Sequence, residues 1–281
     1  MRTISKALLF IPLALLAFPT YGLTLKNDSL RFELLLTREL LYKNHITEKL
    51  TGSIDITPNR LILLATKNQF YLLGWGGIKQ IGKEVVDKNL NSFAYTHDNV
   101  LMVIRANELC VLDSLGTLSK LFKLPNEGMR ICAGRYVMYL YDCNKNQAKN
   151  ALYVIAKGGK YAKLFEVPKP IMSVVEMNDS IIFATENGLF SFNMKSKELK
   201  AIAVLPKNTE VKSIAIDTSA HILYFSTDKA IYALKDSSAI ILTNKLGGIL
   251  RCFNKGLIVF NPENNSLIRI AGIEAYLQST K

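Results

Sequence analysis

The chain alternates short apolar runs with polar breaks from residue 51 to its end. Residues 180–193, SIIFATENGLFSFN, are typical, with two apolar runs separated by Glu186, Asn187 and Gly188. Apolar residues at every second position over about 4 to 8 residues predict β-strands, and two such runs around Asn-Gly predict a β-hairpin. We interpret this stretch as a hairpin whose polar residues form its turn.

The hairpin recurs six times, over residues 60–75, 99–114, 135–158, 180–193, 221–236 and 256–272. The polar residue that opens the second strand marks each copy: Asn68, Asn107, Asn150, Asn187, Lys229 and Asn265. These markers lie 39, 43, 37, 42 and 36 residues apart along the chain. Self-similarity at such a period indicates a repeat architecture.

Each hairpin has one further short run before it and one after it, and in the last copy the final run is the weak EAYLQS at 274–279. Four antiparallel strands in about 40 residues form one propeller blade. These sheets carry apolar residues on both faces, so neighbouring blades must bury them, and ring closure removes open ends. The sequence therefore predicts an all-β protein, a six-bladed β-propeller of four-stranded antiparallel blades. The alternatives are a β-sandwich and an open β-solenoid.

The predicted propeller covers residues 51–281, with blades at about 51–85, 91–125, 129–168, 171–206, 210–246 and 248–281. Residues 23–50 stand outside the repeat. Residues 29–36 alternate like a strand that would close the ring on the last blade, whereas residues 40–42 have the spacing of a short helix on the rim.

The first 22 residues have the layout of a secretory signal peptide. Arg2 and Lys6 precede an apolar run at 7–18, and Pro19 to Gly22 supply a helix breaker and small residues. Twelve apolar residues are too few to span a bilayer comfortably. We expect cleavage after Gly22, no transmembrane span in the mature chain, and a periplasmic or extracellular location. The alternative is an uncleaved membrane anchor.

Blades such as IMSVVEMNDSIIFATENGLFSFNMKSKELKAI, residues 171–202, resemble those of exported six-bladed propellers of the TolB-like and ligand-sensor (two-component regulator) kind. The shared pattern is a short strand, a turn, an apolar strand ending in a small residue and Thr, and then Asn-Gly-Leu. The resemblance covers about residues 51–281 and implies binding of a ligand or protein at a propeller face. This chain departs from the sensor blades in tryptophan content, because it has only Trp75.

The formal net charge is +12 and the isoelectric point is about 9.4, so anionic partners would be attracted. Six lysines at corresponding turns of two successive blades would form a basic rim for an acidic glycan: Lys157, Lys160, Lys163, Lys195, Lys197 and Lys200. The alternative is that these lysines protect outer edge strands from aggregation. Nucleic acid is not an expected partner, because stacking aromatic residues do not interleave with the charges.

No sequence motif for catalysis is present. The chain lacks GxSxG, HExxH and a glycine-rich phosphate loop, and its three histidines show no triad arrangement. Cys110, Cys132, Cys143 and Cys252 form no CxxC motif, so buried free thiols are expected, with one disulfide as the alternative. The leading hypothesis is therefore an exported, non-enzymatic propeller without a cofactor, which binds or scaffolds another envelope or secreted protein.

Polar residues at the ends of the predicted first strands provide an alternative. Calcium-dependent propeller lactonases, which are similar in ring size, bind their metal at the channel with Glu, Asn and Asp from different blades, and Ca²⁺ takes 6–8 oxygen ligands. The weak candidates here are Glu176, Asn178, Asp217 and Asn254, although such residues also suit tight turns. The alternative functions are thus a calcium-dependent hydrolase or lactonase, and a sensor of a glycan or small molecule.

Overall fold

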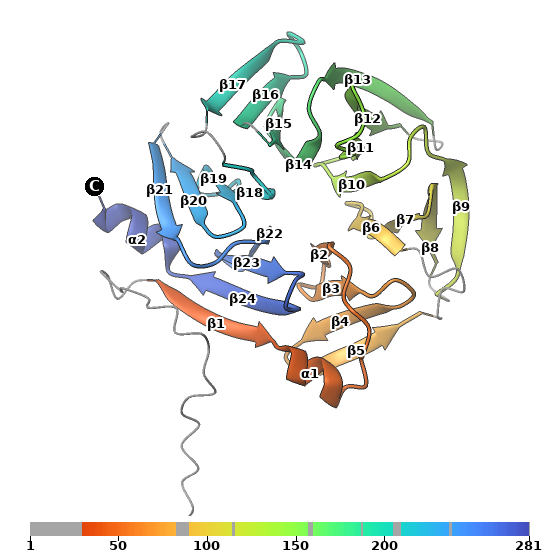
Figure 1. Ribbon diagram of the computed structural model, residues 1–281, viewed down its shortest axis with the longest axis vertical. Helices are drawn as coiled ribbons and strands as arrows, with labels where there is room; N and C mark the ends of the chain where they lie inside the picture. The colour runs from red at the N-terminus through yellow and green to blue at the C-terminus, as the bar shows by residue number, and fades with distance from the viewer. Residues whose placement is uncertain are drawn as a thin grey trace, which may run out of the picture.

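Six four-stranded antiparallel sheets stand in a ring in the computed structural model (Figure 1). The structure describes residues 30–82, 90–113, 116–156, 160–186, 188–204, 209–235 and 238–280. The prediction of an all-β, six-bladed propeller is confirmed. The predicted signal peptide, residues 1–22, lies outside the described residues.

The blades follow one another along the chain, and each begins with its innermost strand. The first blade contains β2 (Ile54–Ile56), β3 (Ile62–Ala65), β4 (Phe70–Gly74) and β5 (Gly77–Ile81). The second contains β6 (Leu90–Tyr95), β7 (Leu101–Arg105), β8 (Glu108–Leu112) and β9 (Leu118–Lys123). The third contains β10 (Met129–Ala133), β11 (Met138–Asp142), β12 (Asn150–Ile155) and β13 (Tyr161–Val167).

The remaining blades keep this order until the last. The fourth contains β14 (Ile171–Met177), β15 (Ser180–Thr185), β16 (Gly188–Asn193) and β17 (Leu199–Val204). The fifth contains β18 (Ser213–Asp217), β19 (Ile222–Ser226), β20 (Ile231–Lys235) and β21 (Ser238–Thr243). The sixth contains β22 (Ile249–Phe253), β23 (Gly256–Asn261), β24 (Ser266–Ala271) and, as its outer strand, β1 (Arg31–Leu36).

The first strand of the chain closes the ring on the last blade. β1 pairs antiparallel with β24, from Arg31 opposite Ala271 to Leu36 opposite Leu267. The Arg269 guanidinium also pairs with the Glu33 carboxylate at 3.0 Å across the two strands. The sixth blade thereby combines both ends of the chain (Figure 1).

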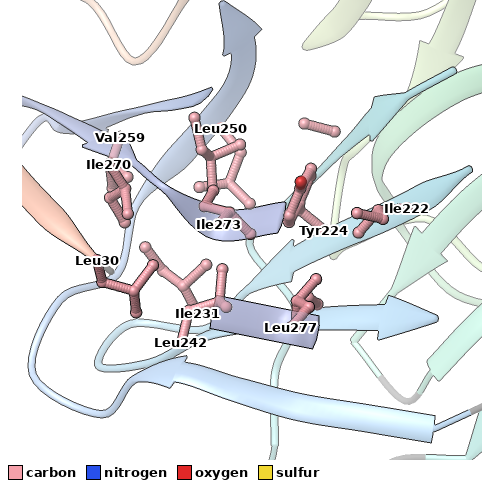
Figure 2. Packing of buried hydrophobic residues seen from close by; sticks show 13 residues of the cluster. Leu30, Ile222, Tyr224, Ile231, Leu242, Leu250, Val259, Ile270, Ile273 and Leu277 are labelled. Carbon is pink, nitrogen blue, oxygen red and sulfur yellow. The ribbon is translucent and has the colours of Figure 1, made fainter. Parts of the chain in front are cut away.

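The expected weak outer strand at residues 274–279 is wrong, because these residues form helix α2 (Ile273–Ser279). Two constraints explain the difference. The outer edge of β24 is already taken by β1, and Gly272 leaves the strand with a φ of 79°. Ile273 and Leu277 lie four residues apart on one face of α2 and pack into the core between the fifth and sixth blades (Figure 2).

A short helix, α1 (Arg38–Lys43), follows β1 and leads the chain towards the first blade. The side chain of Thr37 caps it by accepting a hydrogen bond from the Leu40 N–H at 3.1 Å. Leu41, Ile46 and Leu50 are buried against residues of the first and sixth blades. The segment between β1 and β2 therefore joins the closing strand to the first blade.

Each sheet carries apolar side chains on both faces, and the neighbouring blades bury them. Phe70 of the first blade meets Phe93 of the second with ring centroids 5.5 Å apart. Ile182 and Ala184 of the fourth blade share a core cluster with Phe225 of the fifth. Such packing between neighbouring sheets replaces a single central core and fixes the spacing of the blades.

The hairpin at residues 180–193 is the central hairpin of the fourth blade. Thr185 of β15 pairs with Gly188 of β16, while Asn187 lies outside the described residues. A Cβ atom at Gly188 would come within 2.9 Å of the Ala203 carbonyl oxygen on the next strand. Close packing against β17 therefore requires glycine at this position.

All four cysteines are free thiols, with Cys110 and Cys132 buried and Cys143 and Cys252 partly buried. Among the described residues, no helix is both long and apolar enough to cross a membrane.

We expect ring closure to depend on the inward face of β1. Leu36 is 1% exposed and Leu34 is 40% exposed on the same strand. Leu36→Ala should lower the free energy of unfolding by about 2 to 5 kcal/mol, because it leaves a cavity in the core. The matched variant Leu34→Ala should change it by less than about 0.5 kcal/mol. Urea unfolding followed by circular dichroism measures both values, and equal losses would contradict a closing role for the buried face.

Candidate functional site

Serine side chains link the innermost strands of neighbouring blades. Ser92 Oγ accepts a hydrogen bond from the Ile131 N–H at 3.2 Å, and Ser173 Oγ accepts one from the Ile214 N–H at 3.2 Å. Ser213 Oγ accepts one from the Leu250 N–H at 3.0 Å. Each serine lies near the start of its inner strand and faces the next blade, so these contacts fix the strand starts around the centre of the ring.

Two blades depart from this serine position. In the third blade Arg130 pairs with Tyr141 of the second strand, and in the fourth blade Ser173 pairs with Ala184 at the equivalent place. Arg130 therefore occupies the position that serine has in the fourth blade. Ile249 opposes Phe260 at the corresponding place in the sixth blade. The starts of all six inner strands surround one cavity, which we call the channel mouth. Its lining comprises Gly52, Ser53, Asn91, Ser92, Arg130, Ile131, Tyr141, Met172, Ser173, Lys212, Ser213, Ile249 and Arg251.

An ion pair joins the first and sixth blades at this cavity. Arg251 Nε lies 3.6 Å from Asp55 Oδ1, and Asp55 Oδ2 accepts a hydrogen bond from the Tyr95 N–H at 2.8 Å. Arg251 also donates to the Leu250 carbonyl at 2.8 Å. Asp55 therefore connects three consecutive blades, the sixth, the first and the second.

Burial controls protonation around the channel mouth. It raises the pKa of the Asp55 carboxyl above its ordinary value, although the Arg251 charge and the Tyr95 N–H partly oppose this shift. Burial also raises the pKa of Cys132 to about 12, so this thiol stays protonated at neutral pH. The positive charge of Arg251 partly opposes this rise in the pKa of Cys132.

The four predicted metal ligands lie at the other end of the inner strands, and the carboxylates of Glu176 and Asp217 already accept hydrogen bonds there. Glu176 Oε2 accepts hydrogen bonds from the Tyr139 hydroxyl at 2.8 Å and the Arg135 N–H at 3.1 Å. Asp217 accepts from the N–H groups of Ser219 and Ala220 and from the Ser219 hydroxyl within its own turn.

The two asparagines of this set occupy turn positions. Asn178 and Asn254 have φ values of 55° and 48°, and Asn254 Oδ1 accepts from Arg60 Nη1 at 3.3 Å. A left-handed backbone conformation favours asparagine for local reasons. A ligand-binding role for Glu176, Asn178, Asp217 and Asn254 stays a prediction.

Three of the six lysines of the predicted basic rim are paired with nearby acids. Lys163 pairs with Glu166 at 2.6 Å, Lys195 with Asp179 at 2.6 Å and Lys200 with Glu198 at 3.0 Å. Lys197 lies 5.9 Å from the centroid of the Phe192 ring, and Lys160 is exposed. Lys157 lies outside the described residues. Glycan binding by this rim also stays a prediction.

The residues at the channel mouth do not fit a calcium ion. Ca²⁺ requires 6–8 oxygen ligands, usually several carboxylates among them. Among the described residues, no three His, Cys, Asp or Glu side chains gather as a metal site. The channel mouth instead presents Arg130, Lys212 and Arg251, and the neighbouring carboxylate of Asp55 already contacts Arg251 and Tyr95.

Sequence reasoning missed the channel mouth because it considered the ends of the inner strands and not their starts. A Ser followed by an apolar residue lies at or near the start of the inner strand in four blades, at Ser53, Ser92, Ser173 and Ser213. Aligning the repeats on this serine would have singled out Arg130 as the charged exception.

No family model and no curated protein matches the sequence. The fold is similar to a gluconolactonase from Xanthomonas campestris, at a TM-score of 0.68 and 10% identity over 86% of this chain and 89% of that chain. It is also similar to a propeller in the nidogen/laminin complex, at a TM-score of 0.63 and 12% identity over 74% and 88% of the two chains.

A third similar structure is the extracellular domain of a two-component system from B. thetaiotaomicron, at a TM-score of 0.58 and 15% identity. The match covers 78% of this chain and 32% of that chain, so this chain spans about a third of it. At these identities the comparisons establish the six-bladed propeller fold, shared with sensor-type and TolB-like propellers as the blade pattern predicted.

The comparisons correct the leading functional hypothesis. A non-enzymatic scaffold was expected because catalytic motifs are missing from the sequence. Gluconolactonase-like propellers are among the similar solved structures and match most of both chains, which favours the hydrolase alternative instead. A propeller site is assembled from separate blades, so the lack of a short motif was no argument against catalysis.

The raised pKa of Asp55 predicts a pH-dependent contribution to stability. A carboxyl whose native pKa lies above its unfolded value of about 3.8 contributes most at low pH and loses that contribution as pH rises through the native value. The difference in unfolding free energy, wild type minus Asp55→Asn, should therefore fall as pH rises from about 3 towards neutral. Urea titrations of both proteins across this range measure it, and a rising difference would contradict the assigned shift.

Proposed function

We propose that this protein is a propeller hydrolase of the lactonase kind that acts on a small lactone at the channel mouth. The observation that carries the proposal is a partly buried carboxylate, Asp55, paired with Arg251, which lines the cavity where the six blades meet. The similarity to a gluconolactonase over most of both chains supports it.

The proposed reaction is hydrolysis of a lactone, which is a cyclic ester. The oxygen of a water molecule bonds to the carbonyl carbon, the ring C–O bond breaks, and a hydroxy acid forms. One proton of the water passes to Asp55 and is then delivered to the leaving ring oxygen. A carboxylate with a raised pKa is a better general base at neutral pH than an ordinary one. Arg251 and Arg130 place N–H donors where the carbonyl oxygen becomes negative.

We expect the wild-type protein to open lactones faster than buffer alone, and Asp55→Asn to lose at least about 100-fold of that rate. Acid release from a panel that includes glucono-1,5-lactone can be followed in a pH-stat. Asp179→Asn is the matched control, because Asp179 follows the far end of an inner strand and pairs with Lys195. EDTA and added CaCl₂ should leave the wild-type rate unchanged.

Melting curves of each variant separate lost chemistry from lost structure, because Asp55 also contacts β6. A folded protein that opens no lactone of the panel contradicts the proposed function. Full activity of Asp55→Asn contradicts the role given to this carboxylate, and activity that EDTA abolishes contradicts the calcium-free site.

A second candidate function is sensing of a small molecule, favoured by the similarity to the extracellular domain of a two-component system. The same cavity would then hold its ligand without turnover. Lactone binding that raises the melting temperature, with no acid released, would distinguish sensing from hydrolysis.

We also infer that the protein is exported, from Arg2, Lys6, the apolar run at 7–18 and the small residues up to Gly22. The mature protein should begin at Leu23. The intact mass of protein recovered from cells that express the full chain measures this. A mass that includes residues 1–22 would contradict cleavage.

A further inference from the structure

Three basic side chains from three different blades line the channel mouth. Arg130 comes from the third blade, Lys212 precedes the inner strand of the fifth, and Arg251 comes from the sixth. The third and sixth blades lie opposite each other in a ring of six (Figure 1). The cavity is therefore lined by positively charged side chains on opposite sides of the ring.

The three basic side chains differ in the number of acidic side chains that pair with them. Arg251 lies 3.6 Å from Asp55. Lys212 Nζ lies 3.3 Å from Glu210 and 3.4 Å from Asp228. Arg130 forms no ion pair within the part of the chain that the structure describes. No described carboxylate therefore compensates its positive charge, and its side chain contacts the Cys143 thiol.

Tyr141 adds a polar group without a partner. It opposes Arg130 on the neighbouring strand, lines the same cavity, and is only 6% exposed. Its hydroxyl makes no hydrogen bond to any residue that the structure describes, and it is not one of the fully buried polar atoms that lack a partner, so it remains available to a ligand in the cavity. Burial raises the pKa of Tyr141, so the hydroxyl keeps its proton and can donate.

The size of the cavity limits what it can hold. Its volume is about 20 Å³, and a single water requires about 10 to 15 Å³ by the same measure. The space suits the oxygen atoms of one small charged group, with the rest of a ligand outside. Arg130 and Tyr141 offer N–H and O–H donors to such a group.

We propose that the channel mouth is a carboxylate-binding site in which Arg130 and Tyr141 hold the carboxylate of a small hydroxy acid. A guanidinium matches the geometry of a carboxylate and binds it through two N–H groups. The assignment of a hydroxy acid rests on the proposed function, because opening a lactone produces one. The cationic site itself rests on Arg130 and Tyr141 alone.

Calorimetric titration of the purified protein with gluconate, in low-salt buffer, tests the site directly. Gluconate should bind, and sorbitol, which has a neutral alcohol in place of the carboxylate, should not. Arg130→Met should weaken gluconate binding at least about tenfold. Tyr141→Phe, which removes only the hydroxyl, should weaken it severalfold. Arg135→Met is the matched control, because Arg135 lies just beyond the other end of the same strand, β10, and should bind gluconate like the wild type.

The outcomes separate this site from the proposed hydrolysis. Gluconate binding that depends on Arg130 and Tyr141, with no lactone opened, supports the carboxylate site and contradicts the hydrolase. Lactone opening together with gluconate binding that neither substitution weakens supports the hydrolase and overturns the site. Absence of gluconate binding to folded wild-type protein, or equal binding of sorbitol, also overturns the site.

Discussion

The antiparallel pairing of β1 with β24 holds the first and last parts of the chain in one sheet. The Glu33–Arg269 contact on these strands joins residues 236 positions apart. Without this pairing the sixth blade would keep only β22, β23 and β24, and the early and late segments of the chain would share no sheet. The positions of all six inner strands, and so the geometry of the channel mouth, depend on this closure.

Within the closed ring, several inner strands contact the next blade in the same way, through a side chain that accepts a hydrogen bond from the backbone of that blade. Ser92, Ser173 and Ser213 each reach from the start of an inner strand to the backbone of the next blade, and Asp55 does the same from the first blade to the second. A regular repeat of this kind is structural. The third blade differs from this repeat. Arg130 places a charged group at the channel mouth, at the position where four other blades have a serine hydroxyl.

The fold was predictable because each blade has the same alternation of apolar residues and the same turn signals, so six weak local patterns reinforced one another. Residues 274–279 were harder, because their pattern suits a weak strand and a short helix equally. What decides between the two is the occupant of the β24 edge, about 240 residues away in the sequence.

The candidate site was less predictable than the fold for a related reason. Tyr141 lies on a second strand and Arg251 on an inner strand of another blade, and their sequence neighbours give no sign that they meet. Asp217 has the residue type and turn position of a ligand, but its oxygen is engaged within its own turn. Residues from different blades meet at the centre of the ring only when the ring is closed. Short sequence motifs carry no information about which of these residues meet.

The pairing of the first strand with the last also sets the order in which the molecule can form. A ribosome delivers β1 long before β24, so the backbone of β1 lacks its native pairing strand until β24 has been synthesised. Contacts between distant parts of a chain form slowly, because the intervening segment must first be ordered. The middle blades can pack as they appear, whereas the sixth blade must wait for both ends. During synthesis, the hydrogen-bonding groups on the β24-facing edge of the closing strand therefore stay unpaired until β24 follows.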